Sequence, residues 1–470
     1  MEKPVVIIGG GLAGSEAALQ LAARGIPVVL HEMRPVKPTA VHKTGDFAEL
    51  VCSNSLKSTK AETAAGMQKR ELEMLGSKLY EAALRAKVPA GGALAVDRGL
   101  FASSITKLIE GDPLITVVRG EVASLDTIAD GAAALVLATG PLTSDSLAES
   151  LSQFVAGERM AFYDAAAPIV MADSLDRDVL FCQSRYEDAA DADGNPLGDY
   201  LNAPFTKEEY EAFVDELLEA ELVIKRDFES KDLFQACQPI EEIARAGRDA
   251  PRFGPLKPVG LTDPRTGKRP WAVLQLRAED ASGSCYNMVG FQTNLKFSEQ
   301  QRVFRMIPGM EKAEFARYGV MHRNTFLDAP RVLTPQLRVK TPEVDALGVP
   351  VFVAGQLGGT AGYCEAIRSG LHVALNVAAL LKGVEAPPLP RETAFGALLA
   401  YATDPATKDY QPMHVNFGIF APLEKPIRNK RERYAAYAAR GEIALKAYCD
   451  DLKAAGLMDE RAESHAEAGL

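Results

Sequence analysis

The sequence has little of what marks disulfide scaffolds, zinc modules and membrane proteins. It holds only six cysteines in 470 residues, none of them in C-x-x-C spacing. Their long, irregular gaps exclude a zinc ribbon and a disulfide framework, and fit reduced thiols. No window reaches 18 apolar residues, since the longest apolar stretch, 371–381, contains His372 and Asn376. With no signal-peptide pattern at the start, we expect a cytoplasmic protein without a membrane span or a metal site.

The chain also lacks an excess of positive charge. It has 52 Lys and Arg against 63 Asp and Glu, a net charge of -11, which excludes a protein that is basic over its whole surface. Two stretches depart from this average. Residues 245–277 hold eight basic and two acidic residues, and residues 425–433 hold five basic and one acidic residue. Each stretch is either a phosphate-binding patch or an ordinary solvated face.

The first 35 residues are the most informative. Val5–Ile8 is a short apolar run typical of a buried parallel strand, and residues 15–24 have the composition of a helix. Between them lies a G-x-G-x-x-G turn, Gly9–Gly14. A second strand, beginning at Val28, ends at Glu32, 18 residues after the last glycine. This order of elements predicts a dinucleotide-binding βαβ unit.

Each residue type in that unit has a physical reason. Gly9 permits the tight turn, Gly11 lets the backbone approach a pyrophosphate, and Gly14 lets helix and strand pack closely. The helix N-terminus offers free N–H groups to the pyrophosphate. The Glu32 carboxylate accepts hydrogen bonds from a ribose and repels a 2′-phosphate, so the site suits FAD or NAD better than NADP.

Two later segments favour FAD. The strand at 135–138 ends in Thr139 and Gly140, and a glycine-rich segment, residues 355–362, precedes a helix near the C-terminal end. No second strand–G-x-G-x-x-G–helix unit exists, so a nicotinamide donor is expected to dock transiently over the flavin. The predicted cofactor contacts are Gly9, Gly10, Gly11, Leu12, Ala13, Gly14, Glu32, Met33, Arg34, Thr139, Gly140, Gly355, Gln356, Gly358, Gly359 and Thr360.

Two cysteines are candidates for a reactive role. Cys237 comes just before a predicted helix that starts at Pro239, and the positive end of a helix dipole favours the thiolate. Cys52 lies in a polar loop, residues 36–66, that follows the first βαβ unit. The alternative for both is a small residue without chemistry, which is the expected state of the other four cysteines.

The chain length predicts two or three domains, and its hydrophobic content of 47% supports a large core. We expect an α/β fold: a discontinuous, FAD-binding, Rossmann-like domain with a doubly wound parallel sheet, an inserted α+β domain and a helical C-terminal segment. The expected division is 1–170 for the first part of the FAD domain, 171–320 for the inserted substrate domain, and 321–470 for the second part with the C-terminal helices.

Several segments resemble the folate- and FAD-dependent tRNA uracil-5-methyltransferases, the TrmFO family. The likeness covers nearly the whole chain and is most specific around the two candidate cysteines. It is carried by Val5–Ala18, His31–Pro35, Leu50–Lys57, Cys237–Glu242, Gly290–Lys296, His322–Thr325, Ala354–Leu357 and Gln411–Gly418.

The resemblance implies transfer of a one-carbon unit from 5,10-methylenetetrahydrofolate to C5 of a T-loop uridine of tRNA, with FAD reduced by NAD(P)H. Uracil C5 is a poor nucleophile, and addition of a thiolate to C6 activates it; the resemblance gives Cys237 this role. Cys52 is then either the base that removes the C5 proton or a guard of the flavin site. The uridine must leave its stack to reach the flavin. No membrane and no obligate protein partner are implied.

Three alternatives remain. A wobble-uridine-modifying flavoprotein of the glucose-inhibited-division type shares the fold and the folate carbon source, but such chains are generally longer, with a further helical domain. A small-molecule NAD(P)H-dependent flavin oxidoreductase would leave the basic stretches merely solvated. A non-catalytic flavin-containing RNA-binding module would use them without chemistry.

Overall fold

The computed structural model describes residues 3–39, 41–154, 160–186, 198–223, 238–319, 321–407 and 410–458. Its central element is a five-stranded parallel sheet with the strand order β16-β7-β1-β2-β6. The apolar run at the N-terminus is the middle strand. The strands are β1 (Val5–Ile8), β2 (Val28–Glu32), β6 (Ile115–Arg119), β7 (Ala134–Leu137) and β16 (Val351–Val353).

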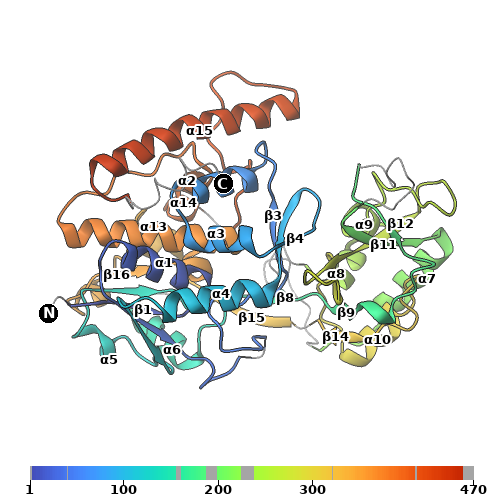
Figure 1. Ribbon diagram of the computed structural model, residues 1–470, viewed down its shortest axis with the longest axis horizontal. Coiled ribbons are helices and arrows are strands. Elements are labelled where there is room, and N and C mark those ends of the chain that lie inside the picture. The colour runs from blue at the N-terminus through green and yellow to red at the C-terminus, as the bar shows by residue number, and fades with distance from the viewer. Residues whose placement is uncertain are drawn as a thin grey trace.

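Helices cover this sheet, as the βαβ reading requires (Figure 1). The two helices that follow the glycine segments, α1 (Leu12–Ala23) and α13 (Tyr363–Lys382), pack on one another. Their approach is so close that a Cβ on Gly370 would lie 2.1 Å from the carbonyl oxygen of Ala13. The other helices of this part are α2 (Ala64–Met74), α3 (Lys78–Arg85), α4 (Arg98–Glu110), α5 (Asp126–Ala129), α6 (Asp145–Phe154), α11 (Ala329–Val332), α12 (Pro342–Asp345), α14 (Ala394–Ala402) and α15 (Lys430–Ala454).

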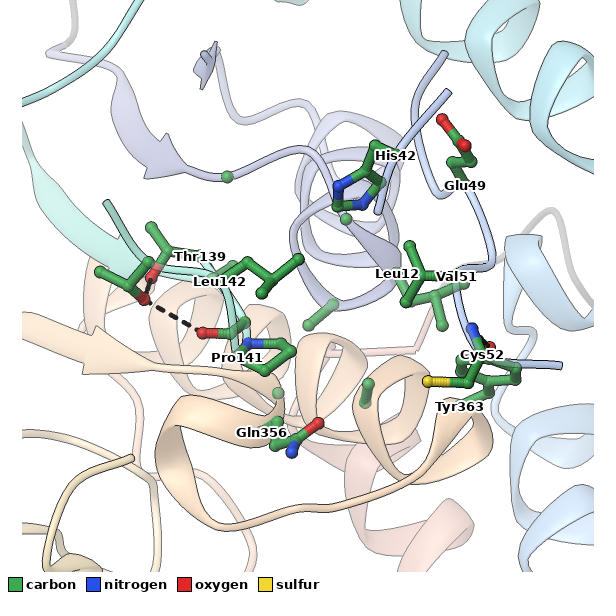
Figure 2. Close-up of a pocket in the computed structure, with 18 of the residues that line it drawn as sticks. Leu12, His42, Glu49, Val51, Cys52, Thr139, Pro141, Leu142, Gln356 and Tyr363 are labelled. Atoms are coloured by element: carbon green, nitrogen blue, oxygen red, sulfur yellow. Dashed lines mark hydrogen bonds between the residues drawn. The ribbon is translucent and has the colours of Figure 1, made fainter. Parts of the chain in front are cut away.

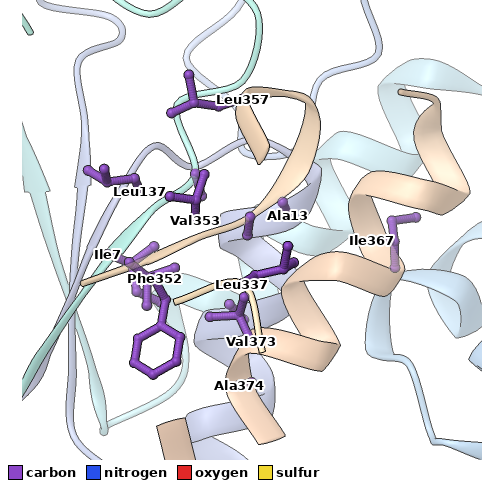
Figure 3. Close-up of a cluster of buried hydrophobic side chains, with 14 of the residues drawn as sticks. Ile7, Ala13, Leu137, Leu337, Phe352, Val353, Leu357, Ile367, Val373 and Ala374 are labelled. Atoms are coloured by element: carbon purple, nitrogen blue, oxygen red, sulfur yellow. The ribbon is translucent and has the colours of Figure 1, made fainter. Parts of the chain in front are cut away.

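The main hydrophobic core lies between the sheet and these two helices. Figure 3 shows side chains of β1, β7 and β16 meeting those of α1 and α13, among them Ile7, Phe352 and Val373. Helix α13 is long and apolar enough to cross a membrane by composition alone, but 83% of its apolar window is buried inside the fold. Its apolarity is therefore that of a core helix.

A second sheet, whose strand pairs are all antiparallel, is built from the middle of the chain and lies to the right in Figure 1. It has a separate core, which extends from Val170 to Phe315. The strand order is β10 (Phe181–Cys182), β11 (Tyr200–Phe205), β12 (Ala272–Ala278), β13 (Cys285–Met288), β9 (Ile169–Met171) and β14 (Phe315–Arg317). The helices beside it are η1 (Ala172–Ser174), α7 (Lys207–Glu219), α8 (Ile240–Ala246), α9 (Ala250–Phe253) and α10 (Phe297–Phe304).

The two parts are joined by an antiparallel pair, β8 (Met160–Ala165) with β15 (Met321–Phe326). The separate core and this double crossing support an insertion, and we propose the division at 170/171 and 320/321; the boundaries themselves stay a prediction.

One local expectation was wrong. The segment 36–66 is not wholly a loop, because it contains β3 (Ser55–Ser58), which pairs with β5 (Ala93–Val96) beside β4 (Lys87–Val88). Pairing between strands about 40 residues apart lies beyond what a periodicity window detects. The stretch that follows folds as the two helices α2 and α3. Gly76, with a left-handed φ of +68°, lies in the three-residue break between them, and the Ser77 side chain caps α3.

Candidate functional site

A cavity of about 590 Å³ lies where four parallel strands end (Figure 2). Residues just after β1, β2, β7 and β16 line it: Gly9, Met33, Thr139 and Gly355. The carboxyl edge of a parallel sheet is where ligands bind in open α/β folds. The tertiary structure thus brings together three segments that are hundreds of residues apart in sequence.

The glycine turn has the geometry that the motif predicts. Gly9 has φ +102°, a left-handed conformation that favours glycine. A Cβ on Gly14 would lie 1.9 Å from the carbonyl oxygen of Gly9, so helix and strand touch at that point. Gly11 is different, since a Cβ there would meet nothing within 4 Å. It is the N-cap of α1 and makes no side-chain cap hydrogen bond, so the first N–H groups of α1 face the cavity.

Glu32 lies in the cavity wall with its carboxylate largely engaged. Oε2 accepts a hydrogen bond from the backbone N–H of Gly10 at 2.8 Å, and Oε1 accepts from the backbone N and Nε of Arg34 at 2.9 and 3.0 Å. Burial works to raise the pKa of Glu32, but the charge and hydrogen bonds of Arg34 outweigh it and lower the pKa. A carboxylate has about four acceptor positions, so Oε2 keeps one for a ribose hydroxyl.

Arg34 holds the Glu32 carboxylate in place through an ion pair. Its side chain is buried, and it also pairs with Glu49 at 3.2 Å and donates to the carbonyl of Thr44. Met33 lines the cavity beside it. Both residues were predicted contacts, and both line the cavity.

At the next strand end, Thr139 and Gly140 line the cavity. The Thr139 hydroxyl lies 2.6 Å from that of Thr143, which donates to the carbonyl of Gly140 at 3.0 Å (dashed lines in Figure 2). These bonds hold a turn in which Gly140 has φ +64°.

In the glycine-rich segment 355–362, some residues line the cavity and others are packed inside the fold. Gly355 and Gln356 line the cavity, whereas Gly358, Gly359 and Thr360 do not. A Cβ on Gly359 would collide with the hydroxyl of Tyr410, so that glycine serves packing. Gly10 and Gly14 also lie outside the lining, while Leu12 and Ala13 belong to it. Cofactor contact by the five residues outside the lining stays a prediction.

Cys52 stands at one end of the cavity, with its sulfur directed into it beside Tyr363 (Figure 2). The hydroxyl of Tyr363, the first residue of α13, accepts hydrogen bonds from the backbone N–H groups of Cys52 and Ser53 at 2.9 and 3.0 Å. Burial raises the pKa of Tyr363 far above its usual range. The phenol therefore stays neutral and positions the Cys52 backbone.

The inserted domain also contacts the Cys52 loop, through hydrogen bonds from two arginines. Arg317 of β14 donates to the carbonyls of Val51 and Cys52 at 2.9 and 3.2 Å. Arg277 of β12 donates to Asn54 Oδ1 at 2.8 Å and to the Ser53 hydroxyl at 2.7 Å. Burial lowers the pKa of both guanidinium groups. The Cys52 loop is therefore clamped between the two domains.

A buried acid of α13, Glu365, lines the cavity. Glu365 is 1% exposed; its Oε1 accepts from Lys57 Nζ at 3.4 Å and from the backbone N of Val415 at 3.1 Å. His414 lines the same wall, and burial, aided by the Lys57 charge, lowers its pKa. Lys57, Tyr363, Glu365 and His414 were all missed by the sequence reasoning. The one usable signal was the position of Tyr363 and Glu365, directly after the glycine segment.

Cys237 lies outside the described residues, which resume at Gln238. The helix expected after Pro239 is confirmed as α8, with Pro239 as its N-cap. The backbone N–H of Ile240 donates to the carbonyl of Gln292 at 2.8 Å, and Gln292 lines the cavity. The start of α8 is therefore tied to the cavity wall.

That tie is reinforced by a buried carboxylate on the same helix. Glu241 is fully buried and accepts from the Thr293 hydroxyl at 3.0 Å and from the backbone N of Asn294 at 2.6 Å. Burial raises the pKa of Glu241 to about 7. Among the described residues, no group of three or more His, Cys, Asp or Glu could hold a metal ion, and the cysteines there are free thiols.

The chain is similar to known proteins along most of its length. The family model described as "Glucose inhibited division protein A" matches residues 4–385. A methylenetetrahydrofolate–tRNA-(uracil-5-)-methyltransferase TrmFO of Desulforudis audaxviator is 50% identical over 95% of this chain and 98% of its own length. The protein of the same description from Geobacter sulfurreducens is 53% identical over 92% and 96%.

Among solved structures, GidA of Aquifex aeolicus superimposes with a TM-score of 0.67 at 17% identity, over 99% of this chain and 75% of that one. At that identity the likeness shows the fold alone, and it confirms the expected α/β class. The sequence relatives go further, because half of the residues are identical along nearly the whole length. The chain belongs to the family of the glucose inhibited division protein A model and, by its relatives, to the TrmFO family.

Proposed function

We propose that this protein methylates C5 of a uridine in the T loop of tRNA, with 5,10-methylenetetrahydrofolate as carbon donor and bound FAD reduced by NAD(P)H. The observation that carries the proposal is the cavity itself, in which a dinucleotide turn and the clamped Cys52 loop face one space. The names of the relatives give, for those proteins, methylenetetrahydrofolate and methylation of uracil C5 in tRNA. We place the enzyme in the cytoplasm.

The residues present fit FAD. The open space at Gly11 and the uncapped start of α1 suit a pyrophosphate, and Glu32 Oε2 suits a ribose hydroxyl. The cavity continues from there to Gly355 and Cys52, as a two-part cofactor requires. When bound, the flavin supplies the reducing equivalents and the carrier for the one-carbon unit.

The chain's own groups then handle the pyrimidine. Cys237, as a thiolate, would add to uracil C6 and so make C5 nucleophilic; its elimination after proton loss from C5 would restore the ring. Support for this role is the attachment of the following helix to Gln292 in the cavity wall. Cys52 would take the C5 proton or guard the flavin site, and the clamp by Tyr363 and Arg317 holds it in either role.

One experiment tests this proposal against its rivals. The flavin-loaded protein receives unmodified tRNA, carbon-labelled methylenetetrahydrofolate and NADPH, and the labelled nucleotide is located by digestion. Label on C5 of the T-loop uridine is expected. Label at the wobble uridine would identify the GidA-type activity instead, and NADPH oxidation without label transfer would identify a small-molecule oxidoreductase.

Cys237→Ala sharpens the result. This variant is expected to keep flavin and tRNA binding and to lose methylation. Cys182→Ala, at a half-buried thiol of the inserted sheet outside the cavity, is the matched control and retains activity. Full activity in Cys237→Ala would remove the nucleophile assignment.

A further inference from the structure

The two basic stretches of the sequence differ in how their charges are used. In the stretch 245–277, Arg245, Arg248 and Arg265 are each in an ion pair, with Glu242, Asp215 and Asp263 respectively. Two further arginines are engaged as well: Arg252 lies 3.8 Å over the Trp271 ring, and Arg277 is buried against the Cys52 loop. This stretch is therefore mostly neutralised or used inside the fold.

The stretch 425–433 has the opposite character. Lys425, Arg428, Lys430 and Arg431 are exposed, and none of them forms an ion pair within the described part of the chain. Lys430 contacts the Tyr434 ring of the same helix, with Nζ 5.4 Å from the ring centroid, and it remains exposed there. The side chain of Asn429 caps α15 by accepting from the backbone N of Arg431 at 2.9 Å, which fixes the backbone that presents these cations. Glu432 is the one acid within the stretch and Glu424 directly precedes it, so an excess of positive charge remains.

The start of α15 borders a shallow hollow of its own, and the chain leads from that hollow to the wall of the main cavity. Lys430, Arg431, Asn429 and Tyr434 line a shallow hollow together with Glu62, in the loop between β3 and α2. Lys57, five residues before Glu62, lines the main cavity, and five residues span at most about 18 Å. In Figure 1 α15 runs across the top of the molecule, above β3 and α2.

A second link runs through the segment that follows His414. His414 lines the cavity, and the Phe417 ring, three residues on, packs on Tyr434 of α15 at 4.2 Å between centroids. Two separate chain segments therefore lead from the cavity wall to the same end of α15. Exposed Lys60, which also lacks an ion pair among the described contacts, lies on the first of these segments.

We infer that Lys60, Lys425, Arg428, Lys430 and Arg431, here called the α15 basic surface, bind the phosphate backbone of the RNA whose uridine enters the cavity. The inference rests on the proposed function and adds the surface that holds the substrate. Free cations gain the full counterion-release free energy from a phosphate, whereas paired arginines must first break an ion pair. On a chain of net charge -11, such a patch also directs the approach of RNA.

The test is a charge reversal on each stretch. Lys430→Glu/Arg431→Glu alters the α15 basic surface, and Lys268→Glu/Arg269→Glu makes the same change at two exposed residues of the other stretch that have no ion pair among the described contacts. Binding of unmodified tRNA is measured from about 0.05 to 0.2 M salt. We expect the first variant to bind about 10- to 100-fold more weakly at 0.1 M salt, with a salt slope smaller by about 2, and the second to change less than threefold.

Each result has a distinct meaning. Equal losses in both variants, or a loss only in the second, overturn the inference. Wild-type protein that neither binds nor methylates tRNA overturns the proposed function and the inference with it. Flavin content, and NADPH oxidation in the absence of tRNA, are measured in each variant to show that the cavity is intact.

Discussion

The two domains contribute to the cavity in different ways. The parallel-sheet domain supplies mainly backbone at the predicted dinucleotide site: glycine turns at strand ends and the uncapped start of α1. Its Glu32 side chain lies beside them, and its Tyr363 side chain holds the Cys52 loop. The inserted domain supplies side chains, Arg277, Arg317 and Gln292, that reach the Cys52 loop or the cavity wall. Backbone sites need particular residue types at fixed spacing, whereas a side-chain clamp needs only one long residue at the right place in space.

This difference explains why one half of the site was visible in the sequence and the other was not. It also predicts different failures. Substitutions in the glycine turns are expected to remove the cofactor. Substitutions of the inserted-domain side chains that reach the Cys52 loop are expected to leave the cofactor bound but to slow the methylation.

The largest effect is expected at the contact between α1 and β1. In Gly14→Ala a Cβ would lie 1.9 Å from the Gly9 carbonyl oxygen, so the helix must move away from the strand. Overpacking of this kind costs about 1–3 kcal/mol. If this cost falls on the conformation that binds flavin, flavin binding weakens by about 5- to 150-fold. Flavin content and fluorescence titration measure it. Gly131→Ala, where a Cβ meets nothing within 4 Å, is the control and should bind flavin normally.

The next effect, on the rate and not on flavin binding, is expected where Arg317 of the inserted domain holds the Cys52 loop. Arg317→Ala removes two hydrogen bonds to the carbonyls of Val51 and Cys52. Because misplacing a catalytic loop costs rate, we expect kcat of methylation to fall by about 10- to 100-fold while flavin affinity stays within about twofold. Arg331→Ala, at a largely exposed arginine paired with Asp328, is the matched control. Loss of flavin in Arg317→Ala would contradict the claim that the inserted-domain side chains affect the rate and not cofactor binding.

The smallest effect is a pH dependence confined to the inserted domain. The pKa of Glu241 is raised by burial to about 7, from 4.5, so the folded state binds the proton more tightly than the unfolded state does. The free energy of unfolding must therefore fall as pH rises from about 4.5 to 7, and level off above. Glu241→Gln keeps an acceptor for Asn294 N but cannot ionise, and should flatten this profile.

The chain offers a local probe for that measurement. Its one tryptophan, Trp271, lies in the inserted domain, so its fluorescence in urea follows that domain. Glu242→Gln, on the same helix but partly exposed, is the control and should keep the wild-type slope. An unchanged profile in Glu241→Gln would show that this carboxyl does not govern the domain's stability.

The fold could be predicted in large part. The strands β1, β2, β7 and β16 and the helix after Gly11 follow from apolar runs bounded by glycine. Strand β3 could not be predicted, because its four residues alternate polar and apolar too briefly and depend on pairing with β5. Gly76 is a possible helix end in the sequence. Only the packing of α2 and α3 decides whether a helix bends at that glycine or ends there.

In the site, the sequence by itself determined the dinucleotide turn and its acid, because a close backbone approach and a strand-end carboxylate impose residue types at fixed spacing. It also determined the family, through long stretches of identical chemistry. Only the tertiary structure decided that Tyr363 and Arg317 hold the Cys52 loop, that Glu365 lies beside it, and which basic stretch keeps its charges free. The reason is that these contacts join residues up to 311 positions apart, and no local pattern encodes which side chains will meet across such a distance.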